Sequence, residues 1–224
     1  MRLSVIVPAL DEEAVIGATL ARLAPLRAAG HQVVLADGGS GDRTREIAAP
    51  LADRVLTGPR GRARQMNAGA AAAHGHILLF LHADTLLPES AAGDITKGLH
   101  STGRRWGRFD VRLTGSLPLL RLVERMMNAR SRLTGVATGD QALFVERSLF
   151  EAVGGFPDIP LMEDVALCKR LKREGAPLCL RSRVVTSSRR WEERGVLRTI
   201  GLMWGLRAAY AAGVSPERLA RLYR

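Results

Sequence analysis

The chain has 224 residues, of which 46% are hydrophobic and 25% charged, so it can form one domain with a full core and is too apolar to be disordered. Its formal net charge is +11, nearly all of it from arginine, which favours anionic partners such as nucleotides, nucleic acids or acidic lipid headgroups without distinguishing among them. The two cysteines, Cys168 and Cys179, have neither the spacing of a metal-binding knuckle nor the framework of a small disulfide-rich domain.

The first hundred residues alternate between short apolar runs and helical segments. Strands are predicted at residues 3–7, where Pro8 closes the run, and at 32–36, 54–56 and 77–84. Helices are predicted after acidic or capping residues at 11–13, 40–42 and 88–89, and over the alanine-rich residues 63–73. This alternation predicts an α/β fold, a mostly parallel doubly wound sheet with helices on both faces.

The second half of the chain continues this pattern and ends in helices. Strands are predicted at 106–113, where the alternation indicates a more exposed strand, and at 141–145 and 177–186. Helices are predicted at 117–133, 148–153, 162–173, 196–211 and 216–224. We expect a single domain, residues 1–224, with a first half at about 1–105, a second half at about 106–195 and a C-terminal helical tail at about 196–224.

Short acidic segments follow the predicted strands of this sheet. They are Asp11 to Glu13, Asp37 in a glycine-rich loop, His82 to Asp84, and Glu163 with Asp164. An acid after a strand usually caps a helix, but parallel strands would deliver all of these acids to one edge of the sheet. Clustered carboxylates there suit Mg²⁺ or Mn²⁺, and arginines at 60, 62 and 64 could hold phosphate oxygens. Together they predict a diphosphate site.

The sequence resembles the family 2 glycosyltransferases, inverting enzymes of the GT-A fold, and in particular their small single-domain bacterial members. The resemblance covers about residues 3–191. It rests on the ordered stretches LSVIVPALDEE, VVLADGGSGDRT, GRARQMNAGA, LLFLHAD, GDQALFV, GGF and MEDVALCKRL, with SRRW at 188–191 as a weaker match. It implies transfer of a sugar from a nucleotide-diphosphate sugar, with a UDP-sugar favoured, to an acceptor that the sequence does not identify.

The resemblance also implies roles for particular residues. Asp164 would be the general base that deprotonates the acceptor, Glu163 would orient it, and Asp84 would bind the divalent cation, Mg²⁺ or Mn²⁺. The residues implied to contact the donor nucleotide are Pro8, Ala9, Glu12, Asp37, Arg64, Asn67, His82 and Ala83. Those implied to border the donor sugar or the acceptor are Gly139, Asp140, Gln141, Arg189, Arg190 and Trp191.

Two positions depart from the family's pattern. Gly38 stands where members usually carry a second aspartate, which leaves the preferred nucleotide base open. His82 stands where the first acid of the DxD metal motif is expected. Its imidazole could bind the metal, donate to a phosphate or pack, and we favour a donor contact or a supporting role.

Two other functions fit the sequence less well. A sugar nucleotidyltransferase would carry a basic glycine-rich loop after its first strand, where this chain has three acids. A nucleic-acid-binding domain would need aromatic stacking platforms, and aromatic residues are only 4% of the chain, so we expect no nucleic-acid partner.

The sequence contains no signal peptide and no run long enough to span a membrane, so we expect a cytoplasmic protein. Helix 196–211 either lies on the inner membrane surface, as a lipid-linked acceptor would favour, or folds back on the domain.

Overall fold

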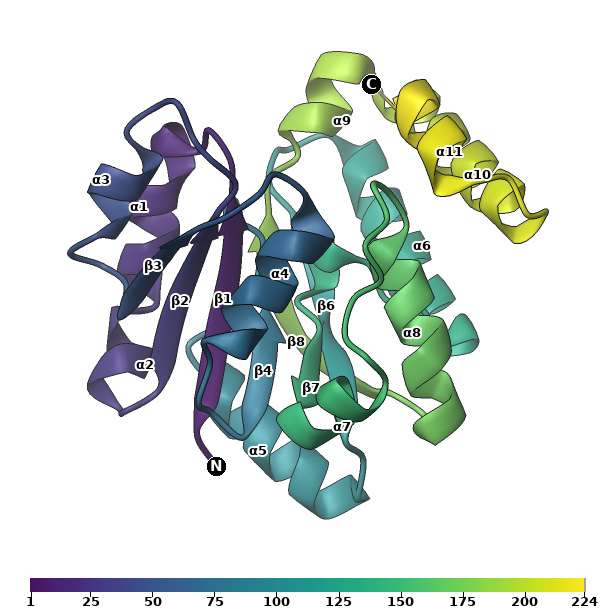
Figure 1. Ribbon diagram of the computed structural model, residues 1–224. Coiled ribbons are helices and arrows are strands. Elements are labelled where there is room, and N and C mark those ends of the chain that lie inside the picture. The colour runs from purple at the N-terminus through teal and green to yellow at the C-terminus, as the bar shows by residue number, and fades with distance from the viewer. Residues whose placement is uncertain (224) are drawn as a thin grey trace.

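A mixed sheet of eight strands forms the centre of the computed structural model, which describes residues 1–223 (Figure 1). The strands are β1 (Leu3–Ala9), β2 (Gln32–Asp37), β3 (Arg54–Thr57), β4 (Ile77–Phe80), β5 (Thr85–Leu86), β6 (Trp106–Leu113), β7 (Phe144–Glu146) and β8 (Leu178–Thr186). Their order across the sheet is β3-β2-β1-β4-β7-β6-β8-β5. The pairs β1/β2, β1/β4, β2/β3 and β6/β8 are parallel, whereas β7 is antiparallel to both of its neighbours and β5 to β8. The predicted α/β fold with a mostly parallel sheet is confirmed.

Helices cover both faces of the sheet and form a hairpin at the C-terminal end (Figure 1). They are α1 (Glu13–Arg22), α2 (Ala24–Ala28), α3 (Thr44–Ala48), α4 (Arg62–Ala71), α5 (Ala91–Thr102), α6 (Pro118–Thr134), α7 (Arg147–Ala152), α8 (Glu163–Glu174), α9 (Arg189–Arg194), α10 (Val196–Ala211) and α11 (Pro216–Tyr223), with the 3-10 turn η1 (Gly139–Gln141). Residue 224, the end of the last predicted helix, lies outside the described residues.

Alternation along β1 explains why the core has two layers. Val5 and Val7 face one layer, which includes Ile16 of α1 and Ile95 of α5. Ile6 faces the other layer, which contains residues of α4, α7 and α8. Successive strand side chains point to opposite faces, so a strand that is apolar throughout must be covered on both sides. The apolar runs of the sequence therefore predict this sandwich correctly.

Two of the predicted strand ends are wrong. Pro8 does not close β1 but lies inside it, opposite Ala36 of β2. Its ring nitrogen falls on the β4 side, where the β1/β4 ladder has already ended at Ile6 and Phe80, so no hydrogen bond is lost there. The strand predicted at 77–84 ends at Phe80, and residues 82–84 leave the sheet as an irregular segment. They carry polar groups beyond the carboxyl end of β4, where ligands of such sheets bind.

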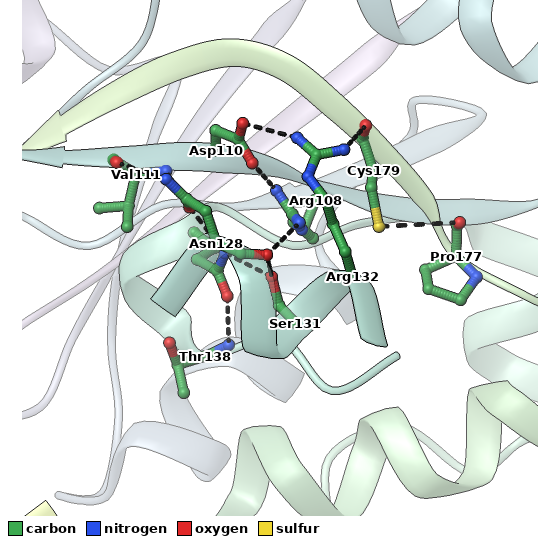
Figure 2. A network of polar contacts seen from close by, with 10 residues as sticks. Arg108, Asp110, Val111, Asn128, Ser131, Arg132, Thr138, Pro177 and Cys179 are labelled. Carbon is green, nitrogen blue, oxygen red and sulfur yellow. Dashed lines mark hydrogen bonds and ion pairs between the residues drawn. The ribbon is translucent and has the colours of Figure 1, made fainter. Parts of the chain in front are cut away.

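The prediction of a more exposed strand at 106–113 is also wrong, because β6 is covered by α6. Arg108 is only 1% exposed, and its guanidinium pairs with Asp110, which also accepts a bond from Arg132 at 2.6 Å (Figure 2). Asn128 of α6 accepts a bond from the Val111 N–H at 2.9 Å and donates one to its carbonyl oxygen at 3.0 Å. Paired in this way, the polar side chains of β6 can be buried.

The segment predicted as a strand at 141–145 begins instead with η1, and β7 starts at Phe144. The short polar turn η1 therefore occupies the start of the segment for which the sequence predicted strand pairing. Ala142 adopts a positive φ of 46°, which ends the turn before β7 begins. The turn leaves Gly139 and Asp140 outside the sheet, next to the segment that follows β4.

The C-terminal helices fold back on the domain, which confirms one of the two alternatives for helix 196–211. Leu206 of α10 and Leu219 of α11 are buried against Met162 and Val165 at the start of α8. Within residues 1–223, none of the helices has the length and apolar character that crossing a bilayer requires.

Candidate active site

The acids predicted at the strand ends gather at one edge of the sheet. Asp37 is the last residue of β2, and Glu12 follows β1. His82 follows β4, and its Nδ1 atom lies 3.3 Å from Oδ1 of Asp140 in η1. Because η1 belongs to the second half of the chain, this contact joins the two halves at the site.

The carboxylate of Asp37 organises the loop that follows β2. It is 1% exposed and accepts hydrogen bonds from the backbone N–H groups of Gly39 (2.9 Å) and Ser40 (3.0 Å) and from the Ser40 hydroxyl. The Gln65 carboxamide donates to the carbonyl oxygens at the ends of β1 and β2, at 2.6 and 2.9 Å. A Cβ atom on Gly38 would lie 2.9 Å from this carboxamide nitrogen. Gln65 thus fills the space that a second aspartate would need.

Of the three acids after β1, Asp11 and Glu13 are held by the neighbouring loop, whereas Glu12 is not. Asp11 and Glu13 accept bonds from backbone N–H groups of the β2–α3 loop, at 2.8 and 3.1 Å, and so tie the two loops together. Glu12 is half-buried, and its pKa is raised first by burial and then by the negative charge of Asp84, against the opposing charges of Arg189 and other nearby cations. The carboxylates of Glu12 and Asp84 are therefore close enough for their charges to interact.

Asp84 and Glu12 fit a cation that is shared with a substrate. Asp84 is half-buried, and its Oδ1 atom accepts a hydrogen bond from the Thr85 hydroxyl at 3.4 Å. Within residues 1–223, no group of three or more His, Cys, Asp or Glu side chains is arranged to hold a metal ion by itself. Mg²⁺ is usually bound through one or two carboxylates together with substrate phosphates, and two neighbouring carboxylates match that donor set.

His82 supports Asp140 and packs tightly against η1. Its Nε2 atom is buried and has no hydrogen-bond partner among residues 1–223, and a Cβ atom on Gly139 would lie 2.0 Å from it. Desolvation works against ionisation of Asp140, but the hydrogen bond and charge of His82, together with Arg62, lower the pKa of Asp140 below its usual value. Of the roles open to this imidazole, the geometry favours supporting Asp140.

Asp164 is the more accessible of the two acids that open α8. Glu163 is 3% exposed and pairs with Arg62 at 3.4 Å, and burial and then the charge of Asp164 raise its pKa. Asp164 is half-buried and accepts bonds from the backbone N–H groups of Gly139 (3.0 Å) and Val165 (2.7 Å). Two backbone donors fix its orientation and leave other lone pairs of the carboxylate available for a substrate proton.

A small cavity lies behind these side chains, between Phe80, His82, Glu163 and Asp164. Its volume of about 10 Å³ is close to what one water molecule needs and far below that of a sugar. The cavity is therefore too small to hold a sugar.

Four predicted site residues have side chains that are engaged elsewhere. Arg64 pairs with Asp158 at 2.8 Å, and the Asn67 carboxamide donates to and accepts from the backbone of the loop after α7, at 2.8 and 3.0 Å. Gln141 is fully buried and donates to a serine hydroxyl of α6 at 3.0 Å. Trp191 packs among the apolar residues that join α6 to α10. Their implied contacts with substrates stay predictions.

The remaining predicted residues lie at the rim of the site. The carbonyl oxygens of Ala9 and Ala83 already accept bonds, the latter from a threonine hydroxyl of α1 at 2.5 Å. Pro8 is half-buried near the end of β1. Arg189 and Arg190 are exposed at the start of α9, and the Arg190 guanidinium lies 5.0 Å from the centre of the Tyr223 ring.

Three residues near the site were not predicted: Gln65, Arg130 and Arg207. Gln65 is one polar residue within an alanine-rich helix, and nothing in its neighbourhood marks it as buried. Arg130 and Arg207 lie on helices α6 and α10, and they are two of 33 lysine and arginine residues. Only the folding of those helices against α8 brings them to Asp164, so no local sequence signal could have found them.

Comparison with known proteins shows the family of this chain. The family described as Glycosyl transferase family 2 matches residues 4–145. A Bacillus subtilis (strain 168) protein named probable glycosyltransferase YdaM is 25% identical over 95% of this chain and 55% of its own length. A PGL/p-HBAD biosynthesis glycosyltransferase of Mycobacterium tuberculosis (strain H37Ra) is 31% identical over 68% of this chain and 62% of its own. The chain thus spans little more than half the length of these relatives.

Solved structures show the same fold. The mannosyltransferase PcManGT from Pyrobaculum calidifontis, in complex with GDP-Man and Mn²⁺, superposes with a TM-score of 0.69 at 20% identity, over 99% of this chain and 68% of that one. S. aureus TarS 1–349 in complex with UDP also gives a TM-score of 0.69, at 18% identity, over 84% and 60% of the two chains. The family match sets aside the nucleotidyltransferase and nucleic-acid-binding alternatives. With a GT-A-like fold and a family 2 sequence, this chain belongs to glycosyltransferase family 2.

Proposed function

We propose that this protein transfers a sugar, with inversion, from a nucleotide-diphosphate sugar to a hydroxyl group of an acceptor, with Asp164 as the general base. The observation that carries the proposal is the contact between the halves: His82, two residues before Asp84, lies 3.3 Å from Asp140 of η1, and Gly139 of the same turn donates to Asp164. An inverting transfer needs a base on one side of the anomeric carbon and a site for the leaving diphosphate on the other. The two groups of acids supply these two sides.

Asp164 is suited to accept the acceptor's proton. The N–H groups of Gly139 and Val165 hold its two oxygen atoms, so the base does not need to reorient during the reaction. Glu163 lies behind it and is balanced by Arg62, which limits the negative charge next to the base. Glu163 therefore acts as a positioning residue.

The leaving diphosphate would lie between Asp84 and the arginines of α9. Arg189 and Arg190 are exposed and close enough to influence the charges of Glu12 and Asp140, so their guanidinium groups can hold phosphate oxygens. Asp84, with Glu12 beside it, would hold Mg²⁺ or Mn²⁺. When bound, the cation neutralises charge that develops on the diphosphate as the glycosidic bond breaks.

We favour a UDP-sugar as the donor. S. aureus TarS is known in complex with UDP and with UDP-GlcNAc, while PcManGT holds GDP-Man, so the fold accommodates more than one base. In this chain Gly38 and Gln65 replace the second aspartate of the loop after β2, and a base contact from an aspartate at position 38 is therefore missing. The preferred nucleotide base of the donor and the transferred sugar would depend on this altered pocket.

A donor screen tests the proposal. Thermal shift and calorimetry with UDP-, GDP- and dTDP-sugars, each with and without Mn²⁺, should reveal metal-dependent stabilisation by one class of donor. Asp84→Ala should remove the metal dependence. Asp164→Asn should keep donor binding but lose transfer by about 10²–10⁴-fold, the usual contribution of a general base. Transfer that survives Asp164→Asn would mean that another group is the base.

We further propose that the protein acts in the cytoplasm and contacts the inner face of a membrane when its acceptor is a lipid. The support is the outer face of α10, where Leu197 and Trp204 are 73% and 59% exposed, together with the net positive charge. Flotation with vesicles of phosphatidylcholine and phosphatidylglycerol should recover the protein with the lipid. Trp204→Ala should weaken that recovery, and an equal recovery of both proteins would argue against contact through α10.

A further inference from the structure

Two arginines lie on helices close to the start of α8, which carries Asp164: Arg130 on α6 and Arg207 on α10. Arg130 of α6 donates from Nη1 to the carbonyl oxygen of Val136 at 3.2 Å. Val136 also packs against the cluster in which Leu206 of α10 is buried, and Leu206 is followed directly by Arg207. The same cluster contains Val165, the neighbour of Asp164. Residues from α6, α8 and α10 thus meet around one segment.

Neither of these two guanidinium groups forms an ion pair with a carboxylate of residues 1–223. The Nη2 atom of Arg130 is buried and has no hydrogen-bond partner there, and the half-exposed Arg207 forms no hydrogen bond within the described residues. By contrast, Arg62 contacts Glu163, and the fully buried Arg108 contacts Asp110. An unpaired polar group that is withdrawn from water is costly, so it points to a missing partner.

The electrostatics of the pair agree with this geometry. Burial lowers the pKa of Arg130 to about 10, and the positive charge of Arg207 acts in the same direction. Burial also lowers the pKa of Arg207, and Asp164 and Asp140 oppose this effect. Both side chains stay cationic near neutral pH and repel each other. An anion between them would relieve the repulsion and supply the missing acceptors.

The pair belongs to the acceptor side of the site rather than to the donor diphosphate. The charges that act most strongly on Glu12 are those of Asp84, Arg189, His82 and Arg62. Arg207, in contrast, is influenced by Asp164 and Asp140. The α10 helix that carries Arg207 packs through Leu206 against Val165, next to the proposed base, which agrees with the charges that act on Arg207.

We propose that Arg130 and Arg207 bind an anionic group of the acceptor, a phosphate or a carboxylate, next to the hydroxyl that Asp164 deprotonates. This inference rests on the proposed function, because it takes Asp164 as the base. Two guanidinium forks recognise a planar carboxylate or a phosphate through paired N–H donors and would fix the acceptor's orientation. The phosphate could belong to a soluble metabolite or to a lipid headgroup, since both present the same oxygens.

Calorimetry with inorganic phosphate tests the site without an identified acceptor. The full chain is first saturated with UDP and Mg²⁺, so that the diphosphate position is filled, and phosphate is then titrated. Arg130→Gln and Arg207→Gln should each weaken phosphate binding by about tenfold, in line with losing a charge-assisted contact, while UDP affinity changes by less than about twofold. Arg207→Lys should retain part of the affinity. Arg198→Gln is the matched control, because Arg198 lies exposed on the same helix and loses the same charge.

Several outcomes would overturn the inference. Phosphate that does not bind the UDP-saturated protein, or that binds equally to Arg207→Gln and Arg198→Gln, would show that the pair is not an anion site. Arg207 is half-exposed, so its variant should fold even where Arg130→Gln does not. Failure of UDP to bind would instead count against the proposed function and leave the phosphate titration of the free protein to decide the anion site.

A second arm identifies the source of the phosphate. Vesicles of phosphatidylcholine with and without phosphatidic acid are sedimented with the wild type and with Arg207→Gln. Binding that needs both phosphatidic acid and Arg207 supports a lipid headgroup. Arginine-dependent binding of inorganic phosphate alone supports a soluble acceptor. Loss of vesicle binding that is equal in Arg198→Gln would indicate general charge attraction and would overturn the lipid source.

Discussion

Gly139→Ala is a sharp test of the geometry around the proposed base. The new Cβ atom would lie 2.0 Å from Nε2 and 2.4 Å from Cε1 of His82. Unbonded heavy atoms are comfortable at about 3.5–4.0 Å, so one partner must move by about 1.5 Å. If His82 moves, its contact with Asp140 is lost, and if η1 moves, the Gly139 N–H leaves Asp164.

Either movement displaces a group at the reacting centre. A displacement of about 1 Å can cost on the order of 10²-fold in rate, so we expect kcat to fall by about that factor while donor affinity changes little. Overpacking of this kind costs about 1–3 kcal/mol, which for a domain of this size lowers Tm by about 2–4 °C per kcal/mol. The measurements are steady-state transfer kinetics, calorimetry with the donor, and thermal unfolding.

The control is Gly201→Ala on α10, where a Cβ atom would meet nothing within 4 Å. This substitution should stabilise the protein by about 0.4–1 kcal/mol and leave kcat unchanged. Combining Gly139→Ala with His82→Ala should restore the stability of the His82→Ala protein, because the clash is removed. A Gly139→Ala protein with wild-type Tm and wild-type kcat would refute the packing of His82 against η1.

Three further predictions concern stability. Asp110→Ala should lower the free energy of unfolding by about 3–5 kcal/mol in urea titrations, because it leaves the fully buried Arg108 without its carboxylate; a loss below 1 kcal/mol would contradict a buried pair. The pKa of His31 is lowered from 6.5, mainly by burial, so the folded chain binds the proton less readily than the unfolded chain. His31 should therefore contribute fully to the free energy of unfolding above pH 6.5, and this contribution should decline as the pH falls from 6.5 towards the lower pKa of the folded state. In urea titrations across pH, His31→Gln should flatten this dependence. Gly38→Asp should cost about 1–3 kcal/mol by displacing Gln65 from two backbone carbonyl groups, and Gln65→Ala should remove most of that additional cost in a double-mutant cycle.

The sequence predicts the layers of this fold well because the central strands are apolar on both faces. The runs that became β1, β2 and β4 cannot be exposed on either side, and the acids that follow them are then placed at one edge. Burial of β6 could not be predicted in this way. Its polar residues are buried because Asn128 and Arg132 of α6, the next helix along the chain, pair with them, and such pairing depends on how the helix packs on the strand.

Motif matching predicted the site residues but did not separate residues with free side chains from those that support the loops. Asn67 and Gln141 lie within motifs, yet their carboxamide groups bond to a neighbouring loop and to α6. Arg130 and Arg207 lie outside the decisive motifs, and they reach Asp164 only through tertiary packing. Side-chain direction at a sheet edge depends on contacts between distant segments, which local sequence does not contain.

The return of α10 to the start of α8 has a consequence for the order in which the protein becomes competent. During synthesis, the eight strands of the sheet leave the ribosome before residues 196–211 do. If Arg207 binds the acceptor as proposed, a nascent chain at that stage lacks this contact. Acceptor selectivity would then depend on the docking of α10 against the start of α8.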